Sequence, residues 1–503
     1  MKTILEYLDM QAALRPEKAA FCDETERLTF GEIDERTRRI GSALLNAGAK
    51  REPVAVLLPR SAKMLCAMLG AMRAGCAYVP LEAEMGELRL RSIFSAVRPR
   101  FLLCDASTEP LARRFGFSGT ALRVEALLTA PIDETALRSA YDRVLDADPA
   151  YIVFTSGSTG APKGVIGKHS AMLDYAEQIT GVLEATDADV FGVQAPLYVD
   201  ACLKEILSVL KTGATLWLVP KALFSTPVPL VEYLNAHRIT TVCWVVPALT
   251  LISALHTFDE VVPQTLKTVA FGSEVFPIRQ LNLWRSTVSA RYINLYGPTE
   301  CTGMSCYYVV DRDFAEGEAV PIGRPFDNTE VLLLDENDRP SNEGEICIRG
   351  VAVCHGYWND PVRTEKAFCQ NPLRKEYPER IYRTGDRGRR NARGELEFLG
   401  RIDNQIKHMG HRIELGELEA AALRVEGVAA ACAVFDAEQK RLALAYTGET
   451  TREALFGALR SAVPDYLLPS RTVRLDAMPL TNNGKTDRMA VHGLCFGKEK
   501  GNA

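Results

Sequence analysis

The sequence predicts an α/β protein in which a large N-terminal domain of layered helices and sheet is followed by a small α+β domain. Three observations predict this fold. The 503 residues exceed what one hydrophobic core usually holds, so two or more domains are expected. Short apolar segments alternate with segments of helical period over residues 1–402. Toward the C-terminus the pattern becomes one of period-two strands and glycine turns.

The strand candidates of the large domain are apolar, rich in β-branched residues and bounded by turn residues. They are YIVF (151–154), FGVQAP (191–196), TLWLVP (215–220), TVCWVV (241–246), TVAFGS (268–273) and RYINLYG (291–297). Segments of helical period separate them, for example residues 171–183 and 201–213. Such alternation is typical of a mainly parallel sheet covered by helices.

The later segments alternate with period two and turn on glycines, which predicts hairpins in a β-rich subdomain and beyond it. They are GEICIRG (344–350), GELEFLGRID (394–403) and QIKHMGHRIELG (405–416). A helix then places Leu418, Ala422 and Val425 on one face, and two strands and a helix near residues 451–463 follow. We therefore expect one domain over residues 1–402 and a small mobile domain over residues 403–503.

Composition excludes several function classes. A net charge of -5 and a pI near 6.0 give no sign of a nucleic-acid or anionic-membrane partner. The thirteen cysteines contain no CxxC pair, so we interpret most of them as small core residues in a reducing compartment. The N-terminal segment lacks the apolar core of a signal peptide, and the longest apolar run, 242–255, is too short to span a bilayer. We expect a cytoplasmic monomer.

The segment FTSGSTGAPKGV (154–165) combines small residues, hydroxyls and a single cation, Lys163, directly after a predicted strand. Such a loop lets backbone N–H groups and hydroxyls converge on a phosphate, and the lysine adds a point charge. A Walker A loop would need Ser or Thr after the lysine, where this chain has Gly164. Composition alone also allows a flexible surface loop.

This loop is one of eight segments that, in order along nearly the whole chain, resemble the motifs of adenylate-forming ligases. This family comprises acyl-CoA synthetases, luciferases and the adenylation domains of nonribosomal peptide synthetases. The other seven segments are LTFGEI (28–33), RAGCAYVPL (73–81), NLYGPTE (294–300), GEICIRG with GYW (344–358), YRTGD (382–386), residues 400–419 and LTNNGKTDR (480–488). The resemblance implies that a carboxylate and ATP form an acyl-adenylate in a site between the domains, and that a thiol then takes the acyl group.

The resemblance also implies how ATP and Mg²⁺ are held. Tyr296 would lie against adenine, Thr299 would bind the α-phosphate, and Glu300 would bind Mg²⁺, which suits a hard cation already bound to phosphates. Asp386, with Arg401 beside it, would bind the ribose hydroxyls. The other nucleotide-binding residues implied are Thr155, Ser156, Gly157, Ser158, Thr159 and Gly160 with Lys163 for the β and γ phosphates, and Gly272, Ser273 and Asn294.

The last motif supplies Lys485, which by resemblance bridges the substrate carboxylate and the α-phosphate. An ammonium there would offset the repulsion between two anions. Asp403 matches a hinge about which the small domain turns between the two half-reactions, so that the segment around Lys407 and Gly410 faces the thiol in the second. Where peptide-synthetase domains usually have Arg before that glycine, this chain has Met409.

Asp200 in LYVDACLKEI falls where many amino-acid-activating members carry the acid that binds the substrate's α-ammonium. The plainer alternative is an ordinary helix N-cap before ACLKEIL. Lys204 lies one helical turn later and would either pair with Asp200 or accept an acidic substrate side chain. The bulk of Trp244, Phe271 and Met304 argues for a small or short substrate side chain. The full set of pocket positions implied is Asp200, Ala201, Lys204, Trp244, Val269, Phe271, Leu295, Gly303 and Met304.

The leading hypothesis is a stand-alone enzyme that activates an amino acid and loads a separate phosphopantetheinylated carrier protein, similar to D-alanine–carrier-protein ligases. The chain ends just after the Lys485 motif, which leaves no room for a carrier domain. Two alternatives remain: an acyl- or aryl-CoA ligase, and a catalytically silent nucleotide-binding relative. The catalytically silent alternative is disfavoured because the chain has all four of Lys163, Glu300, Asp386 and Lys485.

Overall fold

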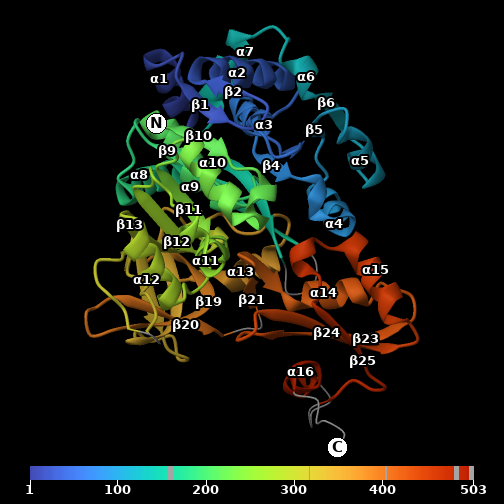
Figure 1. Ribbon diagram of the computed structural model, residues 1–503. Coiled ribbons are helices and arrows are strands. Elements are labelled where there is room, and N and C mark those ends of the chain that lie inside the picture. The colour runs from blue at the N-terminus through green and yellow to red at the C-terminus, as the bar shows by residue number, and fades with distance from the viewer. Residues whose placement is uncertain (157–161, 316–317, 403–404, 481–485, 498–503) are drawn as a thin grey trace, which may run out of the picture. The chain divides into compact units, whose positions relative to one another are not determined.

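The computed structural model describes residues 1–156, 162–315, 318–402, 405–480 and 486–497 (Figure 1). The chain divides into two compact units. The larger comprises residues 1–82, 97–154 and 164–402, and the smaller comprises 83–96, 155–163 and 403–503. The second unit therefore takes in two short segments that the sequence boundaries assign to the first domain.

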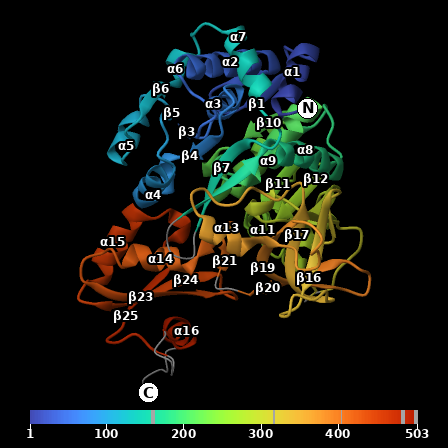
Figure 2. The same ribbon diagram turned by 180° about the vertical axis from the view of Figure 1, so that it is seen from behind.

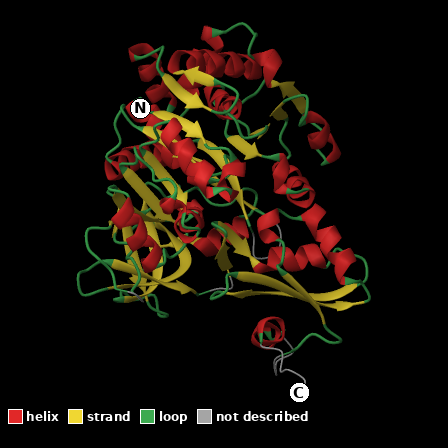
Figure 3. Ribbon diagram, viewed as in Figure 1, coloured by secondary structure: helices red, strands yellow, loops and turns green. Residues whose placement is uncertain are grey.

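The larger unit is built on a nine-stranded sheet. Figure 3 shows all strands of the protein in yellow. The central six strands of this sheet are parallel, as the alternation of elements predicts, and β2, β14 and β15 join them antiparallel. The spatial order is β15 (Arg324–Pro325), β14 (Cys306–Val309), β13 (Arg291–Tyr296), β12 (Thr268–Gly272), β11 (Thr241–Val245), β9 (Val190–Val193), β10 (Thr215–Leu218), β1 (Ala19–Cys22) and β2 (Arg27–Thr29).

Two further sheets belong mainly to this unit. A six-stranded sheet has the order β6 (Thr120–Arg123), β5 (Phe101–Cys104), β3 (Val54–Leu57), β4 (Tyr78–Leu81), β7 (Pro149–Thr155) and β8 (Lys163–Lys168). An antiparallel sheet confirms the predicted β-rich subdomain and contains β16 (Thr329–Leu334), β17 (Glu343–Gly350), β19 (Arg380–Arg390), β18 (Phe368–Gln370) and β20 (Leu396–Arg401), most of which are labelled in Figure 2.

The smaller unit contains a hairpin and a three-stranded sheet. The hairpin joins β21 (Gln405–His408) to β22 (His411–Glu414), and its turn residues Met409 and Gly410 both have positive φ, 52° and 79°. Two residues of positive φ suit a tight hairpin turn. Met409 adopts this backbone conformation, although few residues other than glycine do. The sheet contains β23 (Val428–Asp436), β24 (Arg441–Gly448) and β25 (Arg471–Arg474).

Helices connect most of the strands. Those of the larger unit are α1 (Leu5–Leu14), α2 (Phe30–Asn46), α3 (Ala62–Arg73), α5 (Glu109–Arg114), α6 (Val124–Leu127), α7 (Glu134–Arg143), α8 (His169–Leu183), α9 (Leu203–Thr212), α10 (Pro227–Ala236), α11 (Val246–Ala254), α12 (Ile278–Thr287) and α13 (Pro361–Ala367). Those of the smaller unit are α4 (Glu87–Val97), of which the last residue falls in the larger unit, α14 (Leu415–Ala422), α15 (Arg452–Ala462) and α16 (Arg488–Phe496). Short 3-10 helices are η1 (Ala83–Met85), η2 (Asp200–Cys202), η3 (Lys221–Ser225), η4 (Thr257–Asp259), η5 (Thr299–Cys301) and η6 (Asp465–Leu467).

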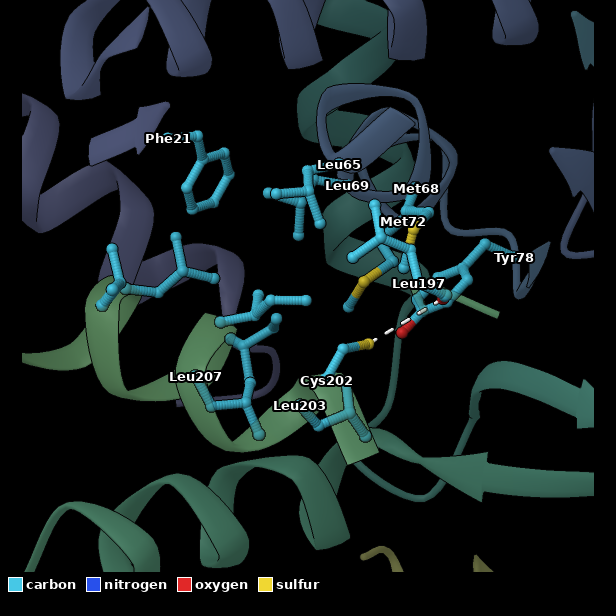
Figure 4. Packing of buried hydrophobic residues seen from close by; sticks show 14 of the residues in the cluster. Phe21, Leu65, Met68, Leu69, Met72, Tyr78, Leu197, Cys202, Leu203 and Leu207 are labelled. Atoms are coloured by element: carbon cyan, nitrogen blue, oxygen red, sulfur yellow. Dashed lines mark hydrogen bonds between the residues drawn. The ribbon is translucent and has the colours of Figure 1, made fainter. Parts of the chain in front are cut away.

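The core of the larger unit anchors α9, the helix that carries Lys204 and directly follows Asp200 and Ala201. Figure 4 shows Leu203 and Leu207 of α9 gathered with Leu65 and Leu69 of α3 and with Phe21 of β1. All five side chains are buried, and a densely packed interior of this kind leaves a helix little freedom to shift. The Cys202 thiol, at the start of α9, donates a hydrogen bond to the Leu197 carbonyl at 3.8 Å.

The cysteines behave as the sequence analysis expects. All thirteen are free thiols, and Cys369 alone among them is not fully buried. The apolar run at residues 242–255 divides between β11 and α11, and in the described part of the chain no helix is long and apolar enough to cross a bilayer.

Gly272, the last residue of β12, leads to the first prediction. A Cβ there would lie 2.4 Å from the Leu295 carbonyl oxygen of the neighbouring strand. We expect Gly272→Ala to lower the free energy of unfolding by about 1–3 kcal/mol, because backbone must move to admit the methyl group. The four tryptophans all lie in the larger unit, so urea unfolding followed by their fluorescence reports on it.

The matched control is Gly181→Ala within α8, where an added Cβ would meet no atom within 4 Å. Alanine is the better helix former by about 0.5–1 kcal/mol, so this variant should be unchanged or slightly more stable. Equal stability of the two variants would contradict the close approach at Gly272.

Candidate active site

The candidate site lies at the carboxyl ends of three neighbouring parallel strands. The register pairs Trp244 of β11 with Phe271 of β12, and pairs Gly272 with Leu295 of β13. Parallel strands in register bring their carboxyl ends to one edge of the sheet, where ligands of open α/β sheets commonly bind. The helical turns η2 and η5 supply further residues to this region.

A small cavity of about 20 Å³ opens among these residues. It is lined by Gln194, Ala195, Ala201, Lys204, Cys243, Trp244, Val245, Ala270, Phe271, Gly272, Ser273, Leu295 and Met304. Six of the predicted pocket residues are in this lining: Ala201, Lys204, Trp244, Phe271, Leu295 and Met304. Gly272 and Ser273, which the resemblance assigns to the nucleotide, line it too.

The remaining predicted pocket positions lie outside the lining. Val269 is fully buried in the hydrophobic cluster around β11, β12 and β13. Gly303 has φ 87°, and a Cβ there would lie 3.0 Å from the ring of Tyr175, so this position needs a glycine for conformation and space. Asp200 precedes the lining residue Ala201 in the chain.

Asp200 is bound by the next predicted motif. The Thr299 hydroxyl donates a 2.7 Å hydrogen bond to Asp200 Oδ1, across 99 positions of sequence. Burial raises the pKa of Asp200, and the bond from Thr299 acts in the opposite direction. A carboxylate that loses hydration favours a nearby cation, because a positive charge restores the stability of its charged form.

The alternative interpretation of Asp200 as a helix N-cap is wrong. Helix α9 begins at Leu203 with Cys202 as its N-cap, and no side chain caps it. Asp200 lies instead in η2, whose cap residue is Val199. The side chain of Asp200 is therefore directed to Thr299 rather than to the first N–H groups of α9.

Lys204 is buried, with 4% of its surface exposed. Its ammonium donates to the Ala201 carbonyl oxygen at 2.6 Å. No ion pair joins it to Asp200 within the described residues, although its charge is near enough to lower the pKa of that acid. The expected Asp200–Lys204 pair is thus not formed as a direct contact.

Glu205, which sequence reasoning missed, is the next residue of α9 and is fully buried. Neither of its carboxylate oxygens finds a hydrogen-bond partner in the described part of the chain. Burial raises its pKa to about 7, against smaller effects of Lys204 and Arg60 that lower it. No signal in the sequence indicated this burial, because Glu205 shares the polar side of the amphipathic helix with Lys204 and Ser208.

Glu300, the predicted metal ligand, is completely buried in η5. Its Oε1 accepts a 2.8 Å hydrogen bond from the Tyr357 phenol. Among the described residues no three His, Cys, Asp or Glu side chains gather as a metal site. One oriented carboxylate still fits Mg²⁺ bound chiefly by phosphates and water, the usual arrangement for this ion at nucleotides.

The predicted ribose-binding pair is in contact. Arg401 Nη1 donates to Asp386 Oδ1 at 2.7 Å, and both residues are largely buried. The Tyr296 phenol donates to the other oxygen, Oδ2, at 2.5 Å. The structure thereby brings together residues from β13, β19 and β20, and the Tyr296–Asp386 bond is a link that sequence reasoning did not predict.

The other predicted nucleotide residues are in different settings. The amide of Asn294 donates to the Pro321 carbonyl at 2.8 Å, and Ser156 is buried. The Thr155 hydroxyl is buried with no hydrogen-bond partner among the described residues. Lys163 begins β8. Gly157, Ser158, Thr159, Gly160, Asp403 and Lys485 lie outside the described residues.

Comparison with known proteins identifies the family. Residues 8–358 match the family described as AMP-binding enzyme. Tyrocidine synthase 1 of Brevibacillus parabrevis is 31% identical over 499 residues, which are 97% of this chain and 45% of that protein. The chain thus spans less than half the length of this relative.

Two solved structures share the fold. An artificially fused adenylation–PCP di-domain, NpsA-ThdA from Klebsiella oxytoca, has a TM-score of 0.82 at 23% identity over 95% of this chain and 94% of that chain. The o-succinylbenzoate CoA synthetase of Bacillus subtilis has a TM-score of 0.82 at 21% identity over 96% of this chain and 97% of that chain. At these identities the likeness shows the fold, and it confirms the predicted α/β architecture with a large and a small domain.

The buried acid of α9 leads to a pH-dependent prediction. Folded Glu205 holds its proton to a pKa of about 7, above the ordinary 4.5, so deprotonation favours the unfolded chain. Its contribution to stability is therefore present at low pH and is lost between pH 4.5 and about 7, by about 3 kcal/mol in total. Glu205→Gln should remove this loss.

The measurement is urea unfolding of both proteins at pH 5 and pH 7.5, followed by tryptophan fluorescence. The variant should gain stability relative to the parent at pH 7.5 and little at pH 5. Glu260→Gln, at an exposed position, is the control and should leave the pH dependence unchanged. A parallel pH dependence in the parent and Glu205→Gln would refute the assignment.

Proposed function

Because the chain belongs to the AMP-binding enzyme family, we propose that it activates an amino acid as the aminoacyl-adenylate and then transfers it to the thiol of a separate phosphopantetheinylated carrier protein. The chain is an ATP-dependent, AMP-forming ligase related to the adenylation domains of nonribosomal peptide synthetases. The amino acid, the separate carrier and the cytoplasmic location are the proposed elements.

The observation that carries the proposal is the carboxylate of Asp200 beside an apolar cavity. Ala201 and Lys204 line the cavity, and Asp200 precedes them on the same turn of chain. The hydrogen bond from Thr299 orients the acid. An acid of raised pKa at this position favours a substrate ammonium, which a simple acyl or aryl acid does not carry.

The nucleotide would be held by residues of the larger unit. Asp386 would accept the ribose hydroxyls, with Arg401 supplying the opposite charge and Tyr296 closing the same network. Glu300 would hold Mg²⁺ together with phosphate oxygens, and the ion when bound would neutralise charge on the phosphates. The buried Tyr357 phenol fixes the orientation of Glu300 before any ligand arrives.

In the first step the substrate carboxylate oxygen attacks the α-phosphorus, a new P–O bond forms, and pyrophosphate leaves with the electron pair of the broken bond. Negative charge grows on the non-bridging and leaving oxygens, so oriented cations lower the barrier. We assign these cations to Lys163 and Lys485, with turning about Asp403 bringing Lys485 into use in this step. The thiolate of the carrier then displaces AMP from the carbonyl carbon.

The defining experiment is ATP–pyrophosphate exchange with purified protein over a panel of L- and D-amino acids and their des-amino counterparts. Exchange that requires an amino acid supports the proposal. CoA-dependent thioester formation from a des-amino acid, without amino-acid-dependent exchange, would instead assign a CoA ligase.

Asp200→Asn tests the ammonium site. The variant keeps a hydrogen-bond acceptor for Thr299 but loses the charge, so kcat/KM for the amino acid should fall about 100-fold or more, as buried charge pairs are lost. Activity with the des-amino acid should change little. Asp187→Asn, a surface position, is the control. Unchanged discrimination between the two acids would remove Asp200 from substrate recognition.

Lys485→Ala tests the role of the late lysine. Adenylate formation should fall about 1,000-fold or more, because a cation at the reacting oxygens supplies several kcal/mol. Thioester formation from supplied aminoacyl-adenylate should stay largely intact, since that step does not use Lys485. Equal loss of the two half-reactions, measured by single-turnover assays, would contradict the turning of the small domain about Asp403.

A further inference from the structure

We propose that the amino acid taken by this site has a short side chain that ends in a carboxylate, and that Lys204 is the specificity-determining residue that binds it. The proposal rests on the amino-acid-activating function above and adds the substrate class. Aspartate is the simplest member of that class. The argument concerns the cavity at the ends of β11, β12 and β13.

Lys204 is the one charged side chain that lines this cavity among the described residues. The rest of the lining is largely apolar and includes Trp244, Phe271, Leu295 and Met304. A lysine needs no place in such a wall for packing, because apolar residues would fill it at lower cost. A buried ammonium is costly to desolvate unless an anion and hydrogen-bond acceptors surround it.

The protein itself satisfies this ammonium only in part. A lysine ammonium has three N–H donors, and the one hydrogen bond it makes within the described residues goes to the neutral Ala201 carbonyl. Asp200 already accepts from Thr299 and makes no direct ion pair with Lys204 in this part of the chain. Glu205 follows Lys204 directly and is close enough for its pKa to be lowered by the ammonium, but its carboxylate makes no hydrogen bond to Lys204 among the described residues.

The apolar wall is rigid and leaves little room, which sets the length of the side chain. The Trp244 ring packs edge-on against Phe224, with 5.0 Å between the ring centroids. Its indole N–H donates a 2.7 Å hydrogen bond to the Gly192 carbonyl oxygen. Phe271 meets Phe276 edge-on at 5.0 Å. The cavity between these walls is small, about 20 Å³. A side chain of aspartate length suits these walls better than a longer one.

Charges then balance between site and substrate. Asp200 would face the α-ammonium, and Lys204 would face the side-chain carboxylate. The α-carboxylate of the substrate, which reacts with ATP, would then face the cations that act on the α-phosphate. A neutral amide of the same shape would bring its NH₂ group or a weaker acceptor to the ammonium, so Lys204 should discriminate aspartate from asparagine.

The test compares aspartate, asparagine and 2-aminobutyrate, each as both enantiomers, in ATP–pyrophosphate exchange. The parent enzyme should prefer aspartate over asparagine by about 100-fold or more in kcat/KM, because the wrong partner leaves a buried charge unpaired. Lys204→Met keeps the length of the side chain and removes its charge. This variant should lose activity with aspartate about 100-fold and gain activity with 2-aminobutyrate, so that the preference between these two substrates shifts to 2-aminobutyrate.

Lys211→Met is the matched control, since Lys211 lies on the same helix but pairs with Glu177 away from the cavity. It should leave the preference unchanged. If Lys204→Met does not fold, Lys204→Gln serves the same comparison, and the preference of the parent enzyme alone can decide against the inference.

The outcomes separate the two proposals. A parent enzyme that exchanges with apolar or amide amino acids better than with aspartate overturns the acidic-substrate inference and leaves the proposed function standing. An unchanged preference in Lys204→Met overturns the role of Lys204. Absence of exchange with every amino acid, alongside CoA-ligase activity, overturns the proposed function itself.

Discussion

The parallel pairing of β11, β12 and β13 is the constraint on which the candidate site depends. Because the three strands are in register, Trp244, Phe271 and Leu295 reach the same edge of the sheet from segments that are distant in sequence. The approach of Gly272 to the Leu295 carbonyl keeps that edge compact. These three side chains are on strands, and strands position a site more accurately than loops do.

Around this edge Asp200 is supported by a hydroxyl and Lys204 by a carbonyl, and no direct ion pair joins the two in the described part of the chain. Glu300 is oriented by a phenol. Neutral partners orient an ionic group but do not cancel its charge. Such groups keep their attraction for a charged ligand. Because folding has already fixed their orientation, less conformational entropy is lost when the ligand binds.

Much of the fold follows from the sequence, because its strands are strongly apolar and its turns are marked by glycine. YIVF lies in β7, TVCWVV begins as β11, and QIKHMGHRIELG forms the β21–β22 hairpin and the start of α14. Local sequence patterns were less informative where packing between distant segments sets the orientation of a side chain. The N-cap interpretation of Asp200 was wrong because Thr299, far away in sequence, binds the side chain. The orientation of Glu300 depends on Tyr357, and no spacing rule links these two residues.

The bond from the Tyr296 phenol to Asp386 couples two sheets, since Tyr296 ends β13 and Asp386 lies in β19. A sugar diol that arrives at Asp386 meets a carboxylate whose two oxygens are already in use. When the diol binds, one of its hydroxyls must replace, or share an oxygen with, the donor already bound to Asp386. The net gain in free energy is the difference between the new hydrogen bond and the one it weakens. If Asp386 binds the ribose as we propose, the fold lowers the affinity for the sugar in advance, which would favour release of the spent nucleotide after each turnover.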